Sequence, residues 1–374
     1  MKMRTFSAVL AMCLCAISAV AAPAKTVTST PAELMYLGVW PHTILVVDAN
    51  QEKVVDKIDL PTDIARTMLL SPDKTKLIVS TLRDNSILTI DLATKKIENC
   101  FSLNDGPSSL RIGGLTTDPS GRLLYAVGTA IDKKIDHYEI GEPKLMVIDL
   151  AAKKVTRSAE FGKDDAFTSQ RASMKVSPDG KLLYMFRQSI FVYDTSTLKL
   201  VKKIELSKAE APETASMSLS PVEDPNAVPG KVTGIFNSSD PYVHQRVFGI
   251  AEVDLATQDY ELTPIGPSAT SIQPLLMSPD RKYGYTVAIY GTNGNRVTEF
   301  WVFDMKTRKL LNKHEFVGRT RLNFGLTADG TKLLIYNAGF EIEVYDAKTL
   351  AMRSTIDLHG DTTSNLVVMP TAGK

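Results

Sequence analysis

A phrase repeated seven times along the chain constrains its fold more than any other feature. Each copy is a β-rich run that ends in aspartate and leads into a short turn, which in the best copies contains a Thr-Lys or Thr-Leu pair. The aspartates recur every 42 to 60 residues, at Asp48, Asp91, Asp149, Asp194, Asp254, Asp304 and Asp346. A period of this length is typical of folds that repeat one supersecondary unit. We expect these aspartates to cap turns by hydrogen bonding rather than to act as catalytic carboxylates.

A second turn phrase alternates with the first. Its copies are Ser71-Pro72-Asp73, Asp118-Pro119-Ser120-Gly121, Ser177-Pro178-Asp179-Gly180, Ser220-Pro221, Ser278-Pro279-Asp280 and Thr327-Ala328-Asp329-Gly330. Proline presets φ for a turn, serine or aspartate bonds back to the chain, and glycine accepts positive φ. Because β-rich segments lie on both sides, each copy predicts a hairpin.

Each unit therefore contains four antiparallel strands, and this period with this strand count is typical of one blade of a β-propeller. The C-terminal run Asn365–Pro370 predicts an innermost strand that lacks its three partners. Those partners are supplied by the N-terminal runs Leu34–Leu37, Thr43–Asp48 and Lys53–Asp59. We predict an all-β, seven-bladed propeller of four-stranded antiparallel blades. Its ring is closed where the N-terminal strands join the C-terminal inner strand, which an open array of blades would not require.

The loop lengths predict two unlike faces. The proline turns and the aspartate turns are expected to stay short and to share one face, here the turn face. Longer connections fall between second and third strands, at Gly128–Lys144, Asn237–Phe248 and Tyr290–Thr298. They share the opposite face, here the loop face, with the links between blades. Because loops on a rigid scaffold carry function, we expect function at the loop face near the axis.

The N-terminus has the layout of a secretory signal peptide. Lys2 and Arg4 precede the apolar run Phe6–Val20, and Ala19-Val20-Ala21 is a small-residue cleavage site. We therefore predict a signal peptide over residues 1–22 and a periplasmic or secreted product.

The mature chain is expected to be one propeller domain over residues 33–370. No later run of about 18 apolar residues exists, so no membrane span is expected. The net charge is +1, and it becomes −1 without Lys2 and Arg4. This near-neutral balance argues against a nucleic-acid partner, which would need phosphate neutralisation.

No local motif for catalysis, metal binding or cofactor attachment is present. Cys100 is the one cysteine beyond the signal, so a Cys-x-x-Cys-His haem site and a cysteine-based metal site are excluded. Hydrolase nucleophile motifs are also missing. No two histidines have metal-ligand spacing, and they lie at His42, His137, His244, His314 and His359. We assign no catalytic, cofactor-binding or metal-binding residue to this chain.

Four arginines stand at similar distances before the turns that end the inner strands, namely Arg66, Arg111, Arg171 and Arg321. At about 3.3 Å per residue they would lie near the mouth of the central channel on the loop face. They could form a positive ring for an anionic ligand or an acidic partner. The alternative is ion pairing between blades or bonding to strand-end carbonyls. Trp40 and His42 cap a loop on the same face, and an exposed tryptophan is often an interface anchor.

The chain resembles the YVTN-type bacterial propellers and, more closely, the β subunits of quinohemoprotein amine dehydrogenases. The resemblance is carried by the insertion Ile131–Glu142 with the following Pro143–Asp149, and by Phe340–Met352. It extends over about Glu33 to Pro370. It implies a non-catalytic subunit of a periplasmic complex that oxidises primary amines. The implied partners are a dihaem cytochrome subunit, which holds haem c, and a small subunit with a cysteine-tryptophan-derived quinone.

Two other interpretations stay open on the sequence alone. The first is a stand-alone exported propeller that binds a small molecule or a protein. The second is a lactonase-type hydrolytic propeller, which would need a polar acid–base cluster or a metal at the channel mouth.

Overall fold

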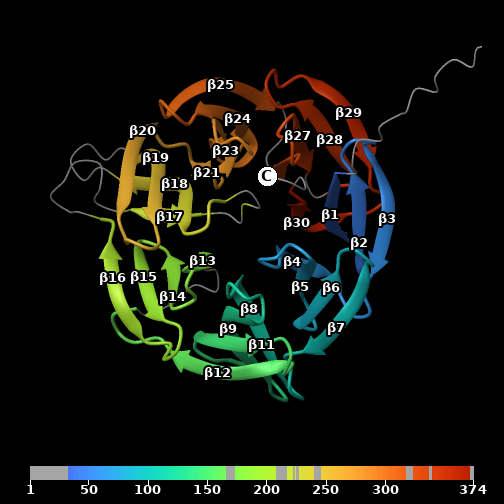
Figure 1. Ribbon diagram of the computed structural model, residues 1–374, viewed down its shortest axis with the longest axis vertical. Helices are drawn as coiled ribbons and strands as arrows, with labels where there is room; N and C mark the ends of the chain where they lie inside the picture. Colours follow the sequence, from blue (N-terminus) through green and yellow to red (C-terminus); the bar gives the residue numbers. More distant parts are fainter. Residues whose placement is uncertain are drawn as a thin grey trace, which may run out of the picture. The chain divides into compact units, whose positions relative to one another are not determined.

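The computed structural model describes residues 33–165, 173–207, 217–221, 224, 227–239, 246–316, 323–336 and 339–370. Residues 1–22, where we predict a signal peptide, lie outside these ranges. The described strands form seven antiparallel blades around a ring, as the sequence predicts (Figure 1). They belong to one compact unit, Ala32–Lys374.

The first four blades hold the strands β1 to β16, together with the last strand of the chain. Blade 1 contains β1 (Leu34–Val39), β2 (Thr43–Asp48), β3 (Lys53–Asp59) and β30 (Thr362–Val368). Blade 2 contains β4 (Ala65–Leu70), β5 (Lys76–Thr81), β6 (Ser86–Asp91) and β7 (Lys96–Ser102). Blade 3 contains β8 (Ser108–Thr117), β9 (Leu123–Lys133), β10 (Tyr138–Ile140), β11 (Lys144–Asp149) and β12 (Lys154–Glu160). Blade 4 contains β13 (Ser173–Val176), β14 (Leu182–Phe186), β15 (Ser189–Asp194) and β16 (Leu200–Glu205).

The remaining three blades hold β17 to β29. Blade 5 contains β17 (Ser218–Ser220), β18 (Lys231–Ser239), β19 (Arg246–Asp254) and β20 (Tyr260–Pro267). Blade 6 contains β21 (Ser271–Ile272), β22 (Leu276–Met277), β23 (Tyr283–Tyr290), β24 (Val297–Asp304) and β25 (Lys309–Phe316), with the short 3-10 turn Asn293–Asn295 before β24. Blade 7 contains β26 (Asn323–Leu326), β27 (Lys332–Tyr336), β28 (Glu341–Asp346) and β29 (Met352–Asp357).

The position of a strand within its blade decides its hydrophobic pattern. The two middle strands are buried on both faces, so they form continuous apolar runs such as Ile44–Val47 and Leu77–Val79. The outermost strand packs on one side only, and in β12 exposed residues alternate with half-buried ones. The described apolar residues form seven clusters, each shared by two neighbouring blades. The core therefore lies between the blades.

The proline turns are built by one hydrogen-bond pattern. In blade 2 the Ser71 hydroxyl donates to Asp73 (2.5 Å) and accepts from the backbone N–H of Lys76 (2.9 Å). The same pattern recurs at Ser177, Ser278 and Thr327. The residue after the aspartate or its equivalent has positive φ, whether it is glycine or not; these residues are Lys74, Gly121, Gly180, Arg281 and Gly330.

Consecutive proline turns also pack on each other. A Cβ added to Gly121 would lie 3.1 Å from the Cδ of Pro72 in the preceding blade, and one on Gly330 would lie 2.6 Å from the Cδ of Pro279. Gly180 packs on Pro119 in the same way. The close approach excludes a Cβ at Gly330 and crowds one at Gly121, and the positive φ of all three residues favours glycine.

The aspartate turns confirm the capping role that the sequence predicts. In all seven copies the carboxylate accepts from backbone N–H groups two or three residues later, as Asp194 does from Ser196 (3.0 Å) and Thr197 (2.8 Å). The residue four positions after the aspartate is left-handed in every copy; these residues are Glu52, Lys95, Lys153, Leu198, Gln258, Arg308 and Leu350.

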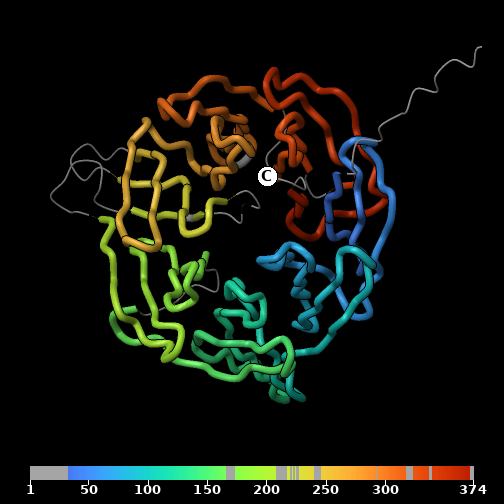
Figure 2. Tube along the Cα trace, viewed as in Figure 1, coloured from blue at the N-terminus to red at the C-terminus, as the bar shows by residue number. Residues whose placement is uncertain are grey.

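Ring closure also follows the prediction. β30 pairs with β1, with Leu366 opposite Leu37 and Val368 opposite Met35. Figure 2 shows the end of the chain, in red, beside the blue strands of the first blade. Blade 1 is thus completed by strands from both ends of the chain.

One loop expectation is wrong. The proline turns were expected to stay short, but in blade 5 residues 221–230 separate β17 from β18. Gly230, with φ of 78°, takes the place of the turn glycine and packs on Pro178 of blade 4. The connection begins as the usual Ser220-Pro221 turn but continues for several residues, and Asp224 within it reaches the channel.

Candidate functional site

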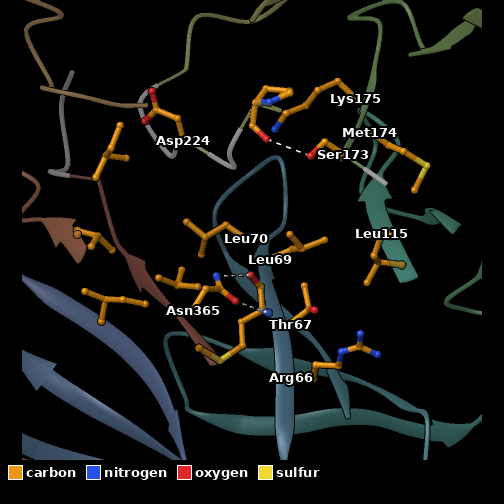
Figure 3. A pocket seen from close by; sticks show the side chains of 18 of the residues that line it. Arg66, Thr67, Leu69, Leu70, Leu115, Ser173, Met174, Lys175, Asp224 and Asn365 are labelled. Carbon is orange, nitrogen blue, oxygen red and sulfur yellow. Dashed lines mark hydrogen bonds between the residues drawn. The ribbon is translucent and has the colours of Figure 1, made fainter. Parts of the chain in front are cut away.

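A cavity of about 530 Å³ occupies the centre of the ring. Its lining includes residues from the innermost strands of six blades and Pro221 directly after the seventh, β17. Figure 3 shows part of this lining around β4, with Asn365 of β30 and Met174 of β13 on other walls. The volume falls within the range of about 300–1,000 Å³ that is usual for small-molecule sites.

Much of the cavity wall is apolar. Leu70, Leu276, Phe324 and Leu366 line it and are half-buried. Other leucine and methionine residues of the lining include Leu69, Leu115, Met174, Met277 and Leu326. Such a wall offers apolar contact to whatever enters the channel.

One polar side chain of the lining, Asn365, holds two blades together. Asn365 of β30 accepts from the backbone N–H of Met68 (3.1 Å) and donates to the carbonyl of the same residue (3.1 Å). These bonds are drawn in Figure 3. The amide therefore links blade 1 to blade 2.

The charged residues of the lining lie toward the two ends of the channel. Arg66 stands at the start of β4, toward the loop face, and its Nη1 donates to the carbonyl of Ile112 (2.9 Å) in the next blade. Lys74 follows β4 in its proline turn, and Lys175 lies near the end of β13. Asp224 is 10% exposed and its carboxylate is 4.0 Å from Nη1 of Arg281. The described lining thus holds three cations, one carboxylate and no histidine.

Two of the four arginines predicted to ring the channel mouth, Arg66 and Arg111, lie among the described residues. Arg66 lines the cavity, and its bond to a strand carbonyl is of the kind expected under the structural alternative. Arg111 is exposed on β8 and is not among the residues that line the cavity. Arg171 and Arg321 lie outside the described residues. The described part of the ring therefore places one arginine in the channel.

Trp40 and His42 lie in the turn between β1 and β2, on the loop face. Trp40 is 56% exposed, and its backbone N–H donates to the carbonyl of Asp361 (2.7 Å). His42 is also exposed. The other tryptophan, Trp301, is buried in the cluster between blades 5 and 6.

A second surface feature is the end of blade 3, where three strands project beyond the blade's own outer strands. β9 pairs with β11 only up to Gly128, and beyond it Ile131 and Asp132 pair with Ser109 and Ser108 of β8 on one side. On the other side they pair with Ile140 and Glu139 of β10. We call Ser108–Arg111, Thr129–Lys133 and Tyr138–Ile140, with the turn between them, the blade 3 extension.

The two faces of the blade 3 extension differ in chemistry. Tyr138 and Ile140 alternate onto one face, where Ile140 is opposite Ile131 and Tyr138 is opposite Lys133. Tyr138 is 63% exposed, Ile140 is 68% exposed, and Ile135 in the turn is fully exposed. The other face carries Asp132 and Glu139.

Surface ion pairs hold the polar side of the extension. Lys134 Nζ lies 3.0 Å from Glu139 and 3.8 Å from Asp132. His137 Nδ1 is 2.7 Å from Asp136. Exposed pairs of this kind are each worth less than about 1 kcal/mol, so the apolar face is the feature that sets this surface apart.

The described residues also include one free cysteine. Cys100 is a free, half-buried thiol on β7, and burial raises its pKa. Within the described ranges, no three His, Cys, Asp or Glu side chains gather in a group that could hold a metal ion. No helix among the described residues is long and apolar enough to cross a bilayer.

Sequence reasoning missed two of these features. The apolar cavity depends on which residues of seven distant strands face the axis, and no local signal gives this. The long blade 5 connection could have been recognised, because Gly230 follows Pro221 by nine residues, seven more than in the other turns.

No protein-family model and no curated protein sequence matches the chain. Solved structures do match in fold. Hydrazine synthase of Kuenenia stuttgartiensis is 16% identical, with 83% of this chain and 96% of that chain covered and a TM-score of 0.51. Dihydro-heme d1 dehydrogenase NirN is 15% identical, with 90% and 75% covered and a TM-score of 0.53. A protein of unknown function from Desulfotomaculum acetoxidans is 12% identical, with 91% and 99% covered and a TM-score of 0.56. At identities this low, the likeness establishes that the chain shares the β-propeller fold of these proteins.

Proposed function

We propose that this protein is an exported, non-catalytic propeller subunit of a periplasmic redox complex, like the β subunit of a quinohemoprotein amine dehydrogenase. In this role it holds partner proteins together and contains no redox cofactor itself. The proposed partners are a dihaem cytochrome subunit with haem c and a small subunit with a cysteine-tryptophan-derived quinone. Primary amines would be oxidised on those partners.

The observation that carries the proposal is the exposed apolar face of the blade 3 extension. Three large apolar side chains of this extension are exposed to solvent, namely those of Ile135, Tyr138 and Ile140. Fully burying a large apolar side chain is worth about 1.5–3 kcal/mol. A partner that covers all three side chains would therefore be held by several times the thermal energy. The same segment, Ile131–Glu142, carries the sequence resemblance.

The similarity in fold to the solved propellers is compatible with a redox complex, but it does not identify the complex. One of the similar structures is a dehydrogenase by name, so the same fold occurs in redox proteins. The sequence resemblance, rather than this likeness, points to an amine dehydrogenase.

The test is affinity isolation of the tagged protein from the periplasm of its own host, followed by haem staining and mass spectrometry. A stoichiometric dihaem cytochrome and a small cross-linked subunit are the expected companions. Ile140→Glu places a charge on the apolar face and should remove them. The matched control is Val201→Glu, an apolar residue of similar exposure (57%) on the outer strand β16. If the two variants retain the same companions, the blade 3 extension is not the docking surface.

The alternative function is a stand-alone exported propeller that binds a small molecule. The central cavity is the observation that favours it. Recovery of a colourless single species from the periplasm would support this alternative over the redox complex.

A further inference from the structure

We propose that the loop face of blades 7, 1 and 2 is a docking surface for a protein partner that presents an apolar patch bordered by basic residues. These three blades follow one another around the ring and share two core clusters (Figure 1). We call residues 340–341, 40–42 and 82–85, with the links 357–361 and 59–64 between the blades, the loop-face patch. It is distinct from the blade 3 extension, and the inference does not depend on which complex the protein joins.

Each of the three blades exposes one large apolar side chain in the hairpin between its second and third strands. Phe340 before β28 is 62% exposed, Trp40 after β1 is 56% exposed, and Leu82 after β5 is 44% exposed. The corresponding hairpins of blades 4 and 6, residues 187–188 and 291–296, contain only polar residues and glycine. Exposed aromatic side chains are frequent anchors of protein interfaces, so this part of the loop face is chemically suited to a protein partner.

The link between blades 7 and 1 holds the first two anchors near each other. The backbone N–H of Leu358 donates to the carbonyl of Phe340 (2.7 Å), and the backbone N–H of Trp40 donates to the carbonyl of Asp361 (2.7 Å). Three residue steps of at most about 3.8 Å each separate the two ends of this link. Phe340 and Trp40 are therefore attached to opposite ends of a segment no longer than about 11 Å.

The link between blades 1 and 2 repeats this arrangement. The backbone N–H of Leu60 donates to the carbonyl of His42 (2.7 Å), and that of Leu82 donates to the carbonyl of Ile64 (3.0 Å). This link is one residue longer, so its ends lie within about 15 Å of each other. A standard interface covers about 800 Å² on each partner, which is wide enough for one protein to cover neighbouring anchors.

The hairpin that carries Leu82 is fixed before any partner binds. The buried carboxylate of Asp63 accepts from the backbone N–H groups of Arg83 and Asp84. The side-chain amide of Asn85 donates to the carbonyl of Arg83 (3.3 Å). A side chain on a backbone that is already ordered costs less conformational entropy to bind, so Leu82 is presented as a preorganised contact.

The charge of the partner follows from the carboxylates around the apolar side chains. Five exposed carboxylates belong to the loop-face patch, namely Asp59, Asp84, Glu341, Asp357 and Asp361. Among the residues of the patch, all of which the structure describes, Arg83 is the one arginine or lysine. Lys57 lies just outside it, 3.4 Å from Asp59. Because the whole chain has a net charge of only +1, the patch is a local excess of negative charge.

This excess selects between possible occupants. Complementary charges at the border of an interface speed association and disfavour wrong partners. A second copy of this chain that used the same patch would bring like charges together, which costs binding energy. A partner with lysines and arginines around an apolar centre would instead match both the anchors and the border.

The test is photo-cross-linking from the patch itself. The full-length protein with Phe340→p-benzoylphenylalanine is irradiated in an extract of its own host, and the cross-linked peptides are sequenced by mass spectrometry. We expect one partner protein, cross-linked through a segment of net positive charge. Raising NaCl from 50 to 300 mM shortens the Debye length from about 14 to about 6 Å, so the yield should fall about threefold or more.

Matched variants of the photo-reactive protein show whether the patch as a whole is responsible. Leu82→Glu should reduce the yield about tenfold, whereas Val201→Glu, on the outer strand β16, should not change it. Asp84→Asn with Asp361→Asn should reduce the yield at 50 mM NaCl and weaken its salt dependence. Asp259→Asn, an exposed carboxylate of the turn face, is the control for charge. Thermal unfolding is compared for all variants, and Leu82→Ala replaces Leu82→Glu if the latter is less stable than the parent protein.

Four results would overturn the proposal. Position 340 could cross-link no more than Val201→p-benzoylphenylalanine does, or the captured protein could be a second copy of this chain. The captured segment could be neutral or acidic, or the Leu82 variant could leave the yield unchanged.

Discussion

The carboxylate of Glu33 accepts hydrogen bonds from the backbone N–H groups of Ala328 and Asp329, almost three hundred positions further along the chain. Ala328 stands where other proline turns carry Pro72, Pro178 and Pro279. Proline has no N–H to donate, so the departure from the repeat at this one turn is what allows Glu33 to bind there. The contact ties blade 7 to the segment that enters blade 1.

The first prediction concerns the charge of Glu33. Burial, together with the negative charge of Asp329, raises the pKa of this carboxyl above its ordinary value of 4.5. Because the folded-state pKa is the higher one, the stability linked to this proton is fully present below about pH 4.5 and is lost as pH rises through the raised value. Glu33→Gln can still accept the two hydrogen bonds but does not titrate. We therefore expect the free energy of unfolding of Glu33→Gln, measured by urea titration, to rise relative to that of the wild type between pH 4.5 and about pH 7. If the difference between the two proteins does not change with pH, the prediction is wrong.

The second prediction concerns the ion pair that joins blades 7 and 1. Lys332 Nζ donates to the carbonyl of Ala49 (2.7 Å) and to Glu52 (2.6 Å), and its side chain is 16% exposed. Lys332→Met removes the cation that binds the Glu52 carboxylate and the Ala49 carbonyl. We expect a loss of about 1–3 kcal/mol in the free energy of unfolding, whereas Lys154→Met on the outer strand should lose almost nothing.

The pH dependence of the Lys332 variant follows from the same pair. Hydrogen bonds from Lys332 and Ser354 lower the pKa of Glu52 from 4.5. For a lowered pKa, the stability is present above the unfolded value and is lost as pH falls through the folded one. The difference between the wild type and Lys332→Met should therefore shrink below about pH 4.5. A constant difference across pH would mean that Glu52 does not take part.

The third prediction concerns the packing of consecutive proline turns. Gly330 has a φ of +73°, and an added Cβ would lie 2.6 Å from Pro279. Gly330→Ala should cost about 1–2 kcal/mol for the left-handed backbone, and more for the displaced proline ring. Gly106→Ala is the control, because its φ is +55° and nothing lies within 4 Å of its Cβ position. Equal unfolding midpoints for the two variants would show that the proline contact adds nothing.

The fourth prediction concerns the left-handed residue of the aspartate turns. Lys153 has a φ of 56° and an exposed side chain. Lys153→Gly removes the cost of the Cβ in this conformation, which is about 1–2 kcal/mol, and adds chain entropy in the unfolded state worth about 0.5–1 kcal/mol. The net change should be a gain of roughly 0.5 kcal/mol. Lys154→Gly, one residue later in β12, should instead destabilise the protein, so a loss in both variants would refute the argument.

The turns could be predicted because their signals are local. The printed bonds of the Asp194 carboxylate go to Ser196 and Thr197, within three positions. The turn signal is therefore contained in about five residues of sequence, and its seven copies give the number of blades. Ring closure could also be predicted, because the three N-terminal strands and the one C-terminal strand together make one complete blade.

The cavity and the blade 3 extension could not be predicted in the same way. Met68-Leu69-Leu70 is a continuous apolar run in which no period shows which side chain faces the axis. Tyr138–Ile140 is three residues long and is separated from β11 by Gly141 to Pro143, so only its pairing with β9 makes it a strand. Both features depend on contacts between segments that the sequence does not place side by side.

The pairing of β30 with β1 has a consequence for how the chain matures. Synthesis delivers the N-terminal strands long before Val368 is available. Until then β1 presents an unpaired edge, to which a strand of another molecule could add. A chain that stops short of β30 would keep that edge exposed permanently, so the inner edge of β1 is covered only in molecules that contain β30.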